Sequence, residues 1–137
     1  MRARNTLLNF LSIYFTDEKG LVKPINPLEY DTNNPYFNEL FNSVDYKEGY
    51  KVLSKEIRTL GENIPPLINS YMNLSPSMKV FGTAINDGFG GVEETGIMIN
   101  ISDIYPEKIE RYITPLRRLA ARFQPKWWKN PILGKHL

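Results

Sequence analysis

Three carboxylates and four glycines lie close together in the segment from Asp87 to Gly96. Two runs of apolar, β-type residues flank this segment, at 79–85 and 95–101. Glycine lets a backbone turn sharply or approach a ligand closely. A carboxylate beside such a turn can hold a proton or a cationic amine. Because a two-residue turn is enough to close a hairpin, this longer acidic connection is the first candidate for a site.

Glu93 is the first candidate for a catalytic group in this segment. Strand alternation puts it on the same face as Ile97, so a core-facing strand would hold its carboxylate in a special environment. A buried carboxylate with a raised pKa can act as a general base. The alternative is a solvated turn in which the acidic side chains bind nothing.

The neighbours of Glu93 are candidates for holding a substrate. Asn86 ends the first run and could hydrogen-bond a carboxylate, although a turn-forming asparagine is the commoner role. Asp87, Phe89 and Glu94 complete this predicted substrate-binding set. Tyr71 lies in a strongly apolar segment and could point its hydroxyl into a site, with a core tyrosine as the commoner explanation.

The composition excludes several other chemistries. The chain of 137 residues has no cysteine and a single histidine, His136. Disulfides, thiolate zinc sites, a Ser-His-Asp triad and a histidine-rich metal site are therefore not expected. No serine lies in a Gly-x-Ser-x-Gly elbow, and the carboxylates lack the spacing of a calcium loop. We expect no bound metal and no bound cofactor.

The periodicity of apolar residues predicts the elements that position these side chains. The predicted helices span 2–15, 35–42, 46–60 with Asp45 as the cap, 66–74, and 106–122 with a kink at Pro115. The predicted strands span 21–25, 79–85 and 95–101. Together they predict an α+β fold in which three to four helices pack on a small mixed or antiparallel sheet with a late β-hairpin.

A sheet of only three strands leaves exposed edges and makes a poor core. The first predicted strand is also weak, because Pro24 cannot donate to a sheet ladder. Two explanations stay open at this point. A second copy of the chain completes the sheet, which implies a homo-oligomer, or the chain is part of a larger fold.

The charge of the chain is unevenly distributed. Seven of the 17 basic residues follow Glu110, and none of the 15 acidic residues does. The side chains predicted to contact an anionic membrane are Arg118, Arg122, Trp127, Trp128 and Lys129. Basic residues around tryptophan are typical of an interfacial anchor, and a solvated basic end is the alternative. Nucleic acid is not an expected partner, because no recognition motif accompanies the charge.

No apolar run approaches the roughly 18 residues that a membrane-spanning helix needs. The start of the chain is basic and then apolar, but Asn9 and Asp17 interrupt the apolar stretch that a signal peptide would require. The sequence therefore predicts a cytoplasmic protein, and leaves a peripheral position on the inner face of the membrane open.

Three blocks of the sequence carry a family resemblance: 61–76 with Ile-Pro-Pro-Leu, 79–86 with Gly-Thr-Ala-Ile-Asn, and 92–97. Together they resemble the hemolysin-like GNAT-type N-acyltransferases, which include the ornithine-lipid and glycine-lipid synthases. Those enzymes acylate the α-amine of an amino acid with a fatty acyl thioester. The resemblance covers about residues 2–112 and matches the C-terminal half of the family.

The resemblance implies a partial GNAT-like fold and an acceptor-side role for residues 1–113, with 114–137 as a basic tail. The donor would be acyl-carrier protein or coenzyme A, and the amine would attack the thioester directly. Glu93 would be the base or ammonium ligand, Asn86 and Asp87 would position the acceptor, and Tyr71 would protonate the leaving thiolate.

The Gln/Arg-x-x-Gly-x-Gly loop by which the family binds its donor is not found in the sequence. We therefore expect a chain that lacks the donor half and is inactive alone, with Met1 as a candidate internal methionine. A non-catalytic module that docks on membranes or dimerises is the alternative function, and a decayed gene product is the third.

Overall fold

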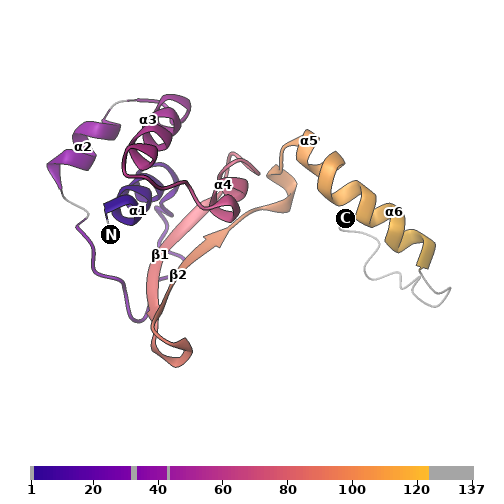
Figure 1. Ribbon diagram of the computed structural model, residues 1–137. Helices are drawn as coiled ribbons and strands as arrows, with labels where there is room; N and C mark the ends of the chain where they lie inside the picture. The colour runs from indigo at the N-terminus through magenta and orange to yellow at the C-terminus, as the bar shows by residue number, and fades with distance from the viewer. Residues whose placement is uncertain (1, 32–33, 43, 124–137) are drawn as a thin grey trace. The chain divides into compact units, whose positions relative to one another are not determined.

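The computed structural model describes residues 2–31, 34–42 and 44–123. The helices are α1 (Arg2–Phe15), α2 (Pro35–Phe41), α3 (Tyr46–Thr59), α4 (Pro66–Met72), α5 (Pro106–Lys108) and α6 (Thr114–Phe123), and the strands are β1 (Lys79–Asn86) and β2 (Val92–Met98) (Figure 1). The chain divides into two compact units, Met1–Asp103 and Ile104–Leu137. The fold is α+β with a small antiparallel sheet, as the sequence predicts. The functional division at residue 113 stays a prediction.

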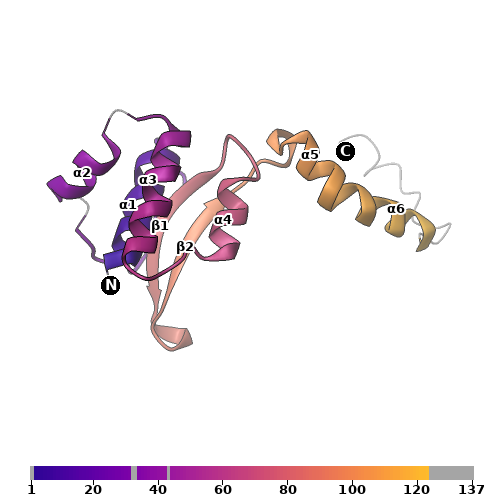
Figure 2. The same ribbon diagram turned by 45° about the horizontal axis from the view of Figure 1, so that its top comes forward.

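Helix α1 is the centre of the first unit. Eight of its 14 residues are buried, and Phe10 and Leu11 are at most 2% exposed. A helix that is apolar on most of its faces must be surrounded by other elements. Accordingly α1 lies beside α3 and beside β1 in both views of the molecule (Figures 1 and 2). Its bounds are those predicted from the sequence.

An aromatic cluster connects α1 to α2 and α3. The ring of Phe10 lies 4.6 Å from that of Tyr14, 5.3 Å from that of Phe41 and 6.1 Å from that of Tyr46. Tilted and edge-to-face pairs at such separations add to the stabilisation that burial alone supplies. Leu53 and Ile57 of α3 complete this core at 0% and 2% exposure.

Helix α3 begins and ends where its sequence signals predict. The Asp45 side chain accepts a hydrogen bond of 3.0 Å from the backbone N–H of Glu48, which satisfies a donor at the first turn. Gly61 follows the helix with a φ of +76°, a left-handed conformation that favours glycine. Helix α4 is shorter than expected and ends at Met72.

The prediction of a strand at 21–25 is wrong. Leu21, Val22 and Ile25 are exposed, and no strand forms there. The edge of β1 is instead covered by a segment a few residues further on. Leu28 donates its N–H to the carbonyl of Thr83 at 2.9 Å, and the N–H of Ile85 donates to Asn26 at 2.8 Å. Pro27 lies between them, where a short edge pairing tolerates a missing donor.

The second strand of the hairpin starts and ends three residues earlier than predicted, at Val92 and Met98 rather than 95 and 101. The reason is the tightness of the connection. Gly90 and Gly91 both adopt positive φ, at +75° and +70°, so the chain reverses within a few residues of Asn86. Glu93 and Glu94 are therefore strand residues rather than loop residues.

A β-bulge in β1 sets which side chains face α1. Val80 pairs with Ile97, but the next paired residue, Thr83, pairs with Thr95, so β1 has one residue more than β2 over this stretch. Gly82 absorbs the extra residue with a φ of +99°. In a regular strand Val80 and Thr83 would point to opposite faces. Because of the bulge both are buried, at 8% and 5% exposure.

The second unit is helical. Helix α5 continues through a π-helical turn at Ile109–Ile113 into α6. Pro115 is the second residue of α6, and it has no N–H to bond the carbonyl of Arg111. A π turn is a recognised way to accommodate such a missing bond. The helical stretch continues through Pro115, and the predicted kink or division of the helix there stays a prediction.

We predict that Gly82→Ala destabilises the protein by about 1–3 kcal/mol, because a side chain is strained at this positive φ. Gly96→Ala is the matched control in the paired strand, where an added Cβ would meet Phe81 at an ordinary 3.6 Å. The measurement is urea unfolding of both variants. Equal stability of the two variants would contradict the role given to the bulge.

Candidate functional site

Two amides hold the acidic side chains at the tip of the hairpin. Asn86 donates to Oε1 of Glu94 at 3.0 Å, across the two strands. Asn26, from the segment that covers β1, donates to Oδ2 of Asp87 at 3.0 Å. Asn86 and Glu94 are thus joined directly and Asp87 is next to Asn86 in the chain, but strand alternation puts Asn86 and Glu94 on the opposite face of the hairpin from Glu93. The fourth residue predicted to bind substrate, Phe89, lies on the same connection and is 71% exposed.

Glu93 lies on the face of β2 that carries Thr95 and Ile97, as predicted from strand alternation. Its side chain is 36% exposed and forms an ion pair with Arg4 of α1, whose side chain is 33% exposed. Two further nitrogens of that guanidinium, Nε and Nη2, donate to Oδ1 of Asn5 at 3.2 and 3.1 Å. The carboxylate is therefore not isolated among apolar groups. It faces a cation fixed by a neighbouring amide.

Tyr71 lies apart from these residues. It is half-buried on α4 and packs against the hydrophobic core. In the described residues no hydrogen bond joins it to Glu93 or Asn86. The arrangement matches the core role of this tyrosine, and its predicted role as a proton donor is not tested by the geometry.

A small cavity of about 50 Å³ lies between α1, the hairpin and the segment that contains Tyr30. The hydroxyls of Thr83 and Thr95 line it and hydrogen-bond to each other at 2.8 Å. Leu8 of α1 closes another side. Burial raises the pKa of the Tyr30 phenol above its usual value, so the group is kept protonated beside this cavity.

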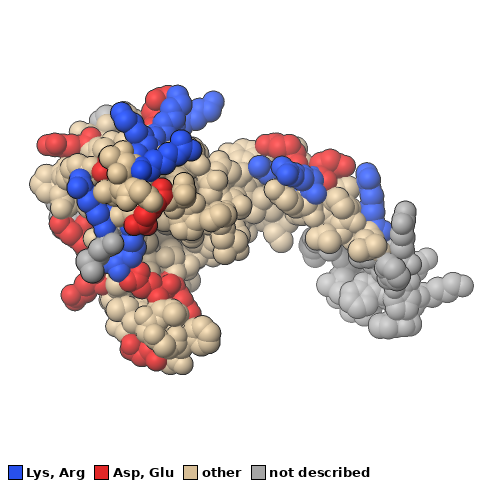
Figure 3. Space-filling view, viewed as in Figure 1, with Lys and Arg blue, Asp and Glu red and all other residues tan. Residues whose placement is uncertain are grey.

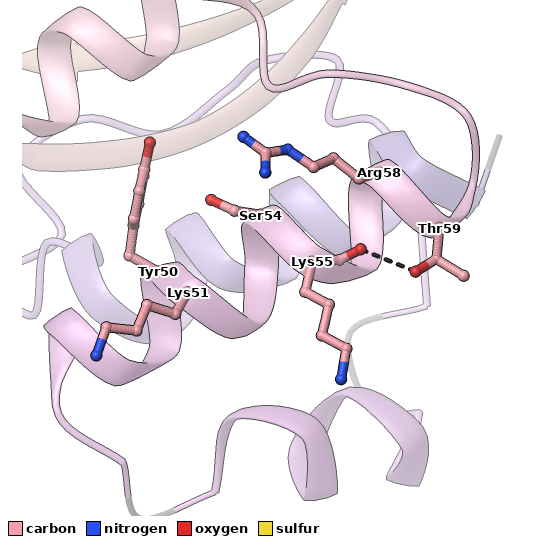
Figure 4. A pocket seen from close by; sticks show the side chains of 6 residues that line it. All are labelled: Tyr50, Lys51, Ser54, Lys55, Arg58 and Thr59. Atoms are coloured by element: carbon pink, nitrogen blue, oxygen red, sulfur yellow. Dashed lines mark hydrogen bonds between the residues drawn. The ribbon is translucent and has the colours of Figure 1, made fainter.

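A second hollow follows one face of α3 (Figure 4). It has a volume of about 540 Å³ and is lined by Tyr50, Lys51, Ser54, Lys55, Arg58 and Thr59. Lys and Arg side chains gather over this helix in the space-filling view (Figure 3). Lys51 pairs with Glu48 at 2.7 Å, and no carboxylate lines the hollow. Such a lining suits an anionic group.

Most of the predicted membrane contacts lie outside the described residues. Trp127, Trp128 and Lys129 are not described, and nothing is described of the Arg122 side chain. Arg118 is exposed and lies 3.6 Å from Glu110. Within the described ranges no helix is long and apolar enough to cross a membrane, and no group of three or more potential ligands is arranged to hold a metal ion.

Two curated proteins match the chain. It is 49% identical over 112 residues to a glycine N(alpha)-acyltransferase of Phocaeicola vulgatus and 50% identical over 112 residues to one of Bacteroides thetaiotaomicron. Over the matched region, the sequence of the chain resembles those of these two acyltransferases. Each match covers 82% of this chain but only 34% and 33% of the relatives. The chain thus spans about one third of the length of the curated relatives it matches.

The matched region necessarily includes the β-hairpin of this chain. Any stretch of 112 residues in a chain of 137 contains residues 26–112. No family model matches the chain, and no solved structure matches it. The two curated relatives support a resemblance to acyltransferases in general, whereas the narrower GNAT and hemolysin-like assignment rests on the sequence blocks alone.

Sequence reasoning missed Arg4 and Tyr30. Arg4 lies 89 residues from Glu93 in the chain, and no local pattern connects the two. The available signal was an arginine on the same helical face as the apolar Leu8, one turn away. Tyr30 falls in a segment without periodicity, so its burial depends on the packing of that segment against β1.

We predict that Tyr30 makes stability fall at high pH. Its folded-state pKa lies above the unfolded value of 10.0. The neutral phenol therefore stabilises the fold below that value, and this contribution is lost as the pH rises through the folded pKa. Between about pH 9 and pH 11, on either side of the ordinary tyrosine pKa, urea unfolding should show a smaller loss for Tyr30→Phe than for the unmodified chain. The control is Tyr112→Phe, at an exposed position, and an unchanged slope in Tyr30→Phe would refute the assignment.

Proposed function

We propose that the chain is the acceptor-side part of an N-acyltransferase of aminolipid synthesis. The fatty acyl group would pass from acyl-carrier protein or coenzyme A to the α-amine of a small amino acid. One observation carries this proposal. Across a region that includes the hairpin, the chain is 49% and 50% identical to two glycine N(alpha)-acyltransferases. The GNAT-like class rests on the blocks at 61–76, 79–86 and 92–97.

Acyl transfer to an amino acid requires a neutral amine, because an ammonium has no lone pair to attack a thioester. We assign Glu93 as the group that holds the ammonium or takes its proton. The amine nitrogen then bonds to the thioester carbon and releases its surplus proton to water, the carbon–sulfur bond breaks, and the thiolate takes up a proton. Strand alternation places Asn86 and Glu94 on the opposite face of the hairpin from Glu93. In this assignment they contribute, with Asp87 and Phe89, at the hairpin tip rather than beside the ammonium. Tyr71 is the proposed donor of the proton that the thiolate takes up.

The described residues contain fewer features that could bind the acyl donor than features that could bind the acceptor. The described sheet has two strands, and no glycine-rich loop between a strand and a helix occurs in the described ranges. Since the chain spans about one third of the length of its curated relatives, we propose that activity needs the remaining segments of the acyltransferase fold. Both proposed donors carry phosphate groups, and the cation-lined hollow on α3 has the chemistry to receive one.

A peripheral contact with membranes is a second candidate function, favoured by α6. Leu116 and Leu119 of α6 are 65% and 52% exposed at the i, i+3 spacing of one helical face, and Tyr112 of the preceding π turn is 51% exposed. Arg111, over the ring of Tyr112, and Arg118 are basic residues of the same helical stretch. Exposed apolar residues together with arginines on one helix are typical of a helix that lies in a membrane interface.

The catalytic proposal is tested in a hybrid enzyme, in which this chain replaces the matching third of the Bacteroides thetaiotaomicron relative. We predict acylation of glycine by long-chain acyl-carrier protein, detected by mass spectrometry. Glu93→Gln in the hybrid should lower kcat by about 100- to 10,000-fold, the range for loss of a general base. The control is Glu48→Gln, the same change at an exposed carboxylate on α3, which should leave kcat unchanged.

Two results would contradict this proposal. A folded hybrid without acyl transfer would remove the acceptor-side assignment. A hybrid that keeps full activity with Glu93→Gln would remove the role of Glu93.

The membrane proposal is tested with vesicles of phosphatidylglycerol and phosphatidylcholine. We predict that the chain co-sediments with the anionic vesicles and that Leu116→Ser with Leu119→Ser weakens this binding by about 100-fold or more, since each fully buried leucine contributes about 1.5–3 kcal/mol and 1.4 kcal/mol is tenfold. Leu67→Ser, at an exposed position of α4, should have no effect. Equal binding of both variants would refute a role for α6.

A further inference from the structure

The guanidinium of Arg4 is held by Asn5 as well as by Glu93, which a purely structural salt bridge does not need. The two members of this ion pair come from different elements, α1 and β2, and each side chain is about one third exposed. The guanidinium is held along one edge, where Nε and Nη2 donate to Oδ1 of Asn5. Its orientation therefore does not depend on Glu93.

We propose that Arg4 and Glu93 form a clamp for the zwitterion of a small α-amino acid, with Arg4 binding the carboxylate and Glu93 binding the ammonium. This inference rests on the proposed function, because it takes the acceptor to be an amino acid. It adds Arg4 to the site as a substrate-binding residue.

The chemistry of the two groups matches that of the ligand. In an α-amino acid the ammonium and the carboxylate are attached to the same carbon, so opposite charges lie side by side. Arg4 and Glu93 present the complementary charges side by side. With Asn5 on the Nε and Nη2 edge, the end of the guanidinium formed by Nη1 and Nη2 keeps donors that fit a carboxylate in a two-bond fork.

The pair can open at little cost. Partly exposed ion pairs contribute little to stability, because water solvates both charges once they separate. An incoming zwitterion would replace the direct contact with two charge-assisted contacts. The ligand-free pair keeps each charge paired until the acceptor arrives.

The other charges near this end of the hairpin are engaged elsewhere. Asp87 and Glu94 accept hydrogen bonds from Asn26 and Asn86. On the same helix end as Arg4, Arg2 lies 3.7 Å from Glu56 and over the ring of Tyr36. Among these groups it is Arg4 and Glu93 that place opposite charges directly together between α1 and β2.

A small cavity lies near the clamp. Leu8 lies one helical turn after Arg4, and Thr95 lies two strand residues after Glu93, so each pair shares a face of its element. Leu8 and Thr95 both line the cavity of about 50 Å³. The cavity therefore lies on the same faces of α1 and β2 as the clamp.

The first test measures ligand binding to the purified chain by NMR titration. The probes are glycine, glycinamide, which lacks the carboxylate, and N-acetylglycine, which lacks the ammonium. We predict that glycine binds about 10- to 100-fold more tightly than either analogue, the range for loss of a contact to a charged group. Arg4→Ala should abolish the preference over glycinamide, and Glu93→Gln the preference over N-acetylglycine. Arg2→Ala is the control and should keep both.

The second test separates binding from a purely structural role. The charge-swapped variant Arg4→Glu with Glu93→Arg restores an ion pair between the same elements, so its urea unfolding should resemble that of the unmodified chain. In the hybrid enzyme this variant should still have a raised KM for glycine, because the ammonium and the carboxylate would meet the wrong partners. Arg4→Ala should likewise raise the KM for glycine more than it lowers kcat.

The outcomes separate this inference from the proposed function. An active hybrid in which Arg4→Ala leaves the KM for glycine unchanged would overturn the clamp and leave the function standing. A hybrid without acyl transfer would overturn the function, and the binding preferences of the purified chain would still decide the clamp. Absence of glycine binding to the folded chain would overturn the clamp.

Discussion

The burial of α1 is the constraint on which the first unit depends. Phe10, Leu11 and Phe15 are at most 6% exposed, on a helix with apolar residues on most of its faces. Burying one such side chain contributes about 1.5–3 kcal/mol, so an arrangement that leaves α1 uncovered is strongly disfavoured. The helices α2 and α3 and the strand β1 all pack on α1 for this reason. The position of the hairpin follows from that packing.

The chemistry of the site follows from the same constraint. The bulge at Gly82 keeps Val80 and Thr83 on the face toward α1, and their partners Ile97 and Thr95 share the face of Glu93. As that face approaches the polar start of the helix, Glu93 meets Arg4 rather than an apolar side chain. A carboxylate in this position is suited to holding an ammonium, because it carries its charge beside water and a second polar group.

Features set by local chemistry were predictable from the sequence. The cap at Asp45, the glycine after α3 and the bounds of α1 follow from residue types within a few positions. The strand expected at 21–25 failed because β1 pairs with Asn26–Leu28 instead, a choice made by tertiary contacts. The face of Glu93 was predictable from alternation, whereas its partner was not, since 89 residues separate it from Arg4. A resemblance between sequences identifies a class of reaction, but charge pairs between distant elements appear only when the chain is folded.

The measurement that tests the account most directly is an intermolecular nuclear Overhauser experiment on the chain with glycine bound. The account predicts contacts from the glycine methylene protons to the side chains of Arg4 and Glu93, at the junction of α1 and β2. Contacts confined to another surface, such as the hollow lined by Lys55 and Arg58 on α3, would contradict the claim that the hairpin and α1 form the acceptor site.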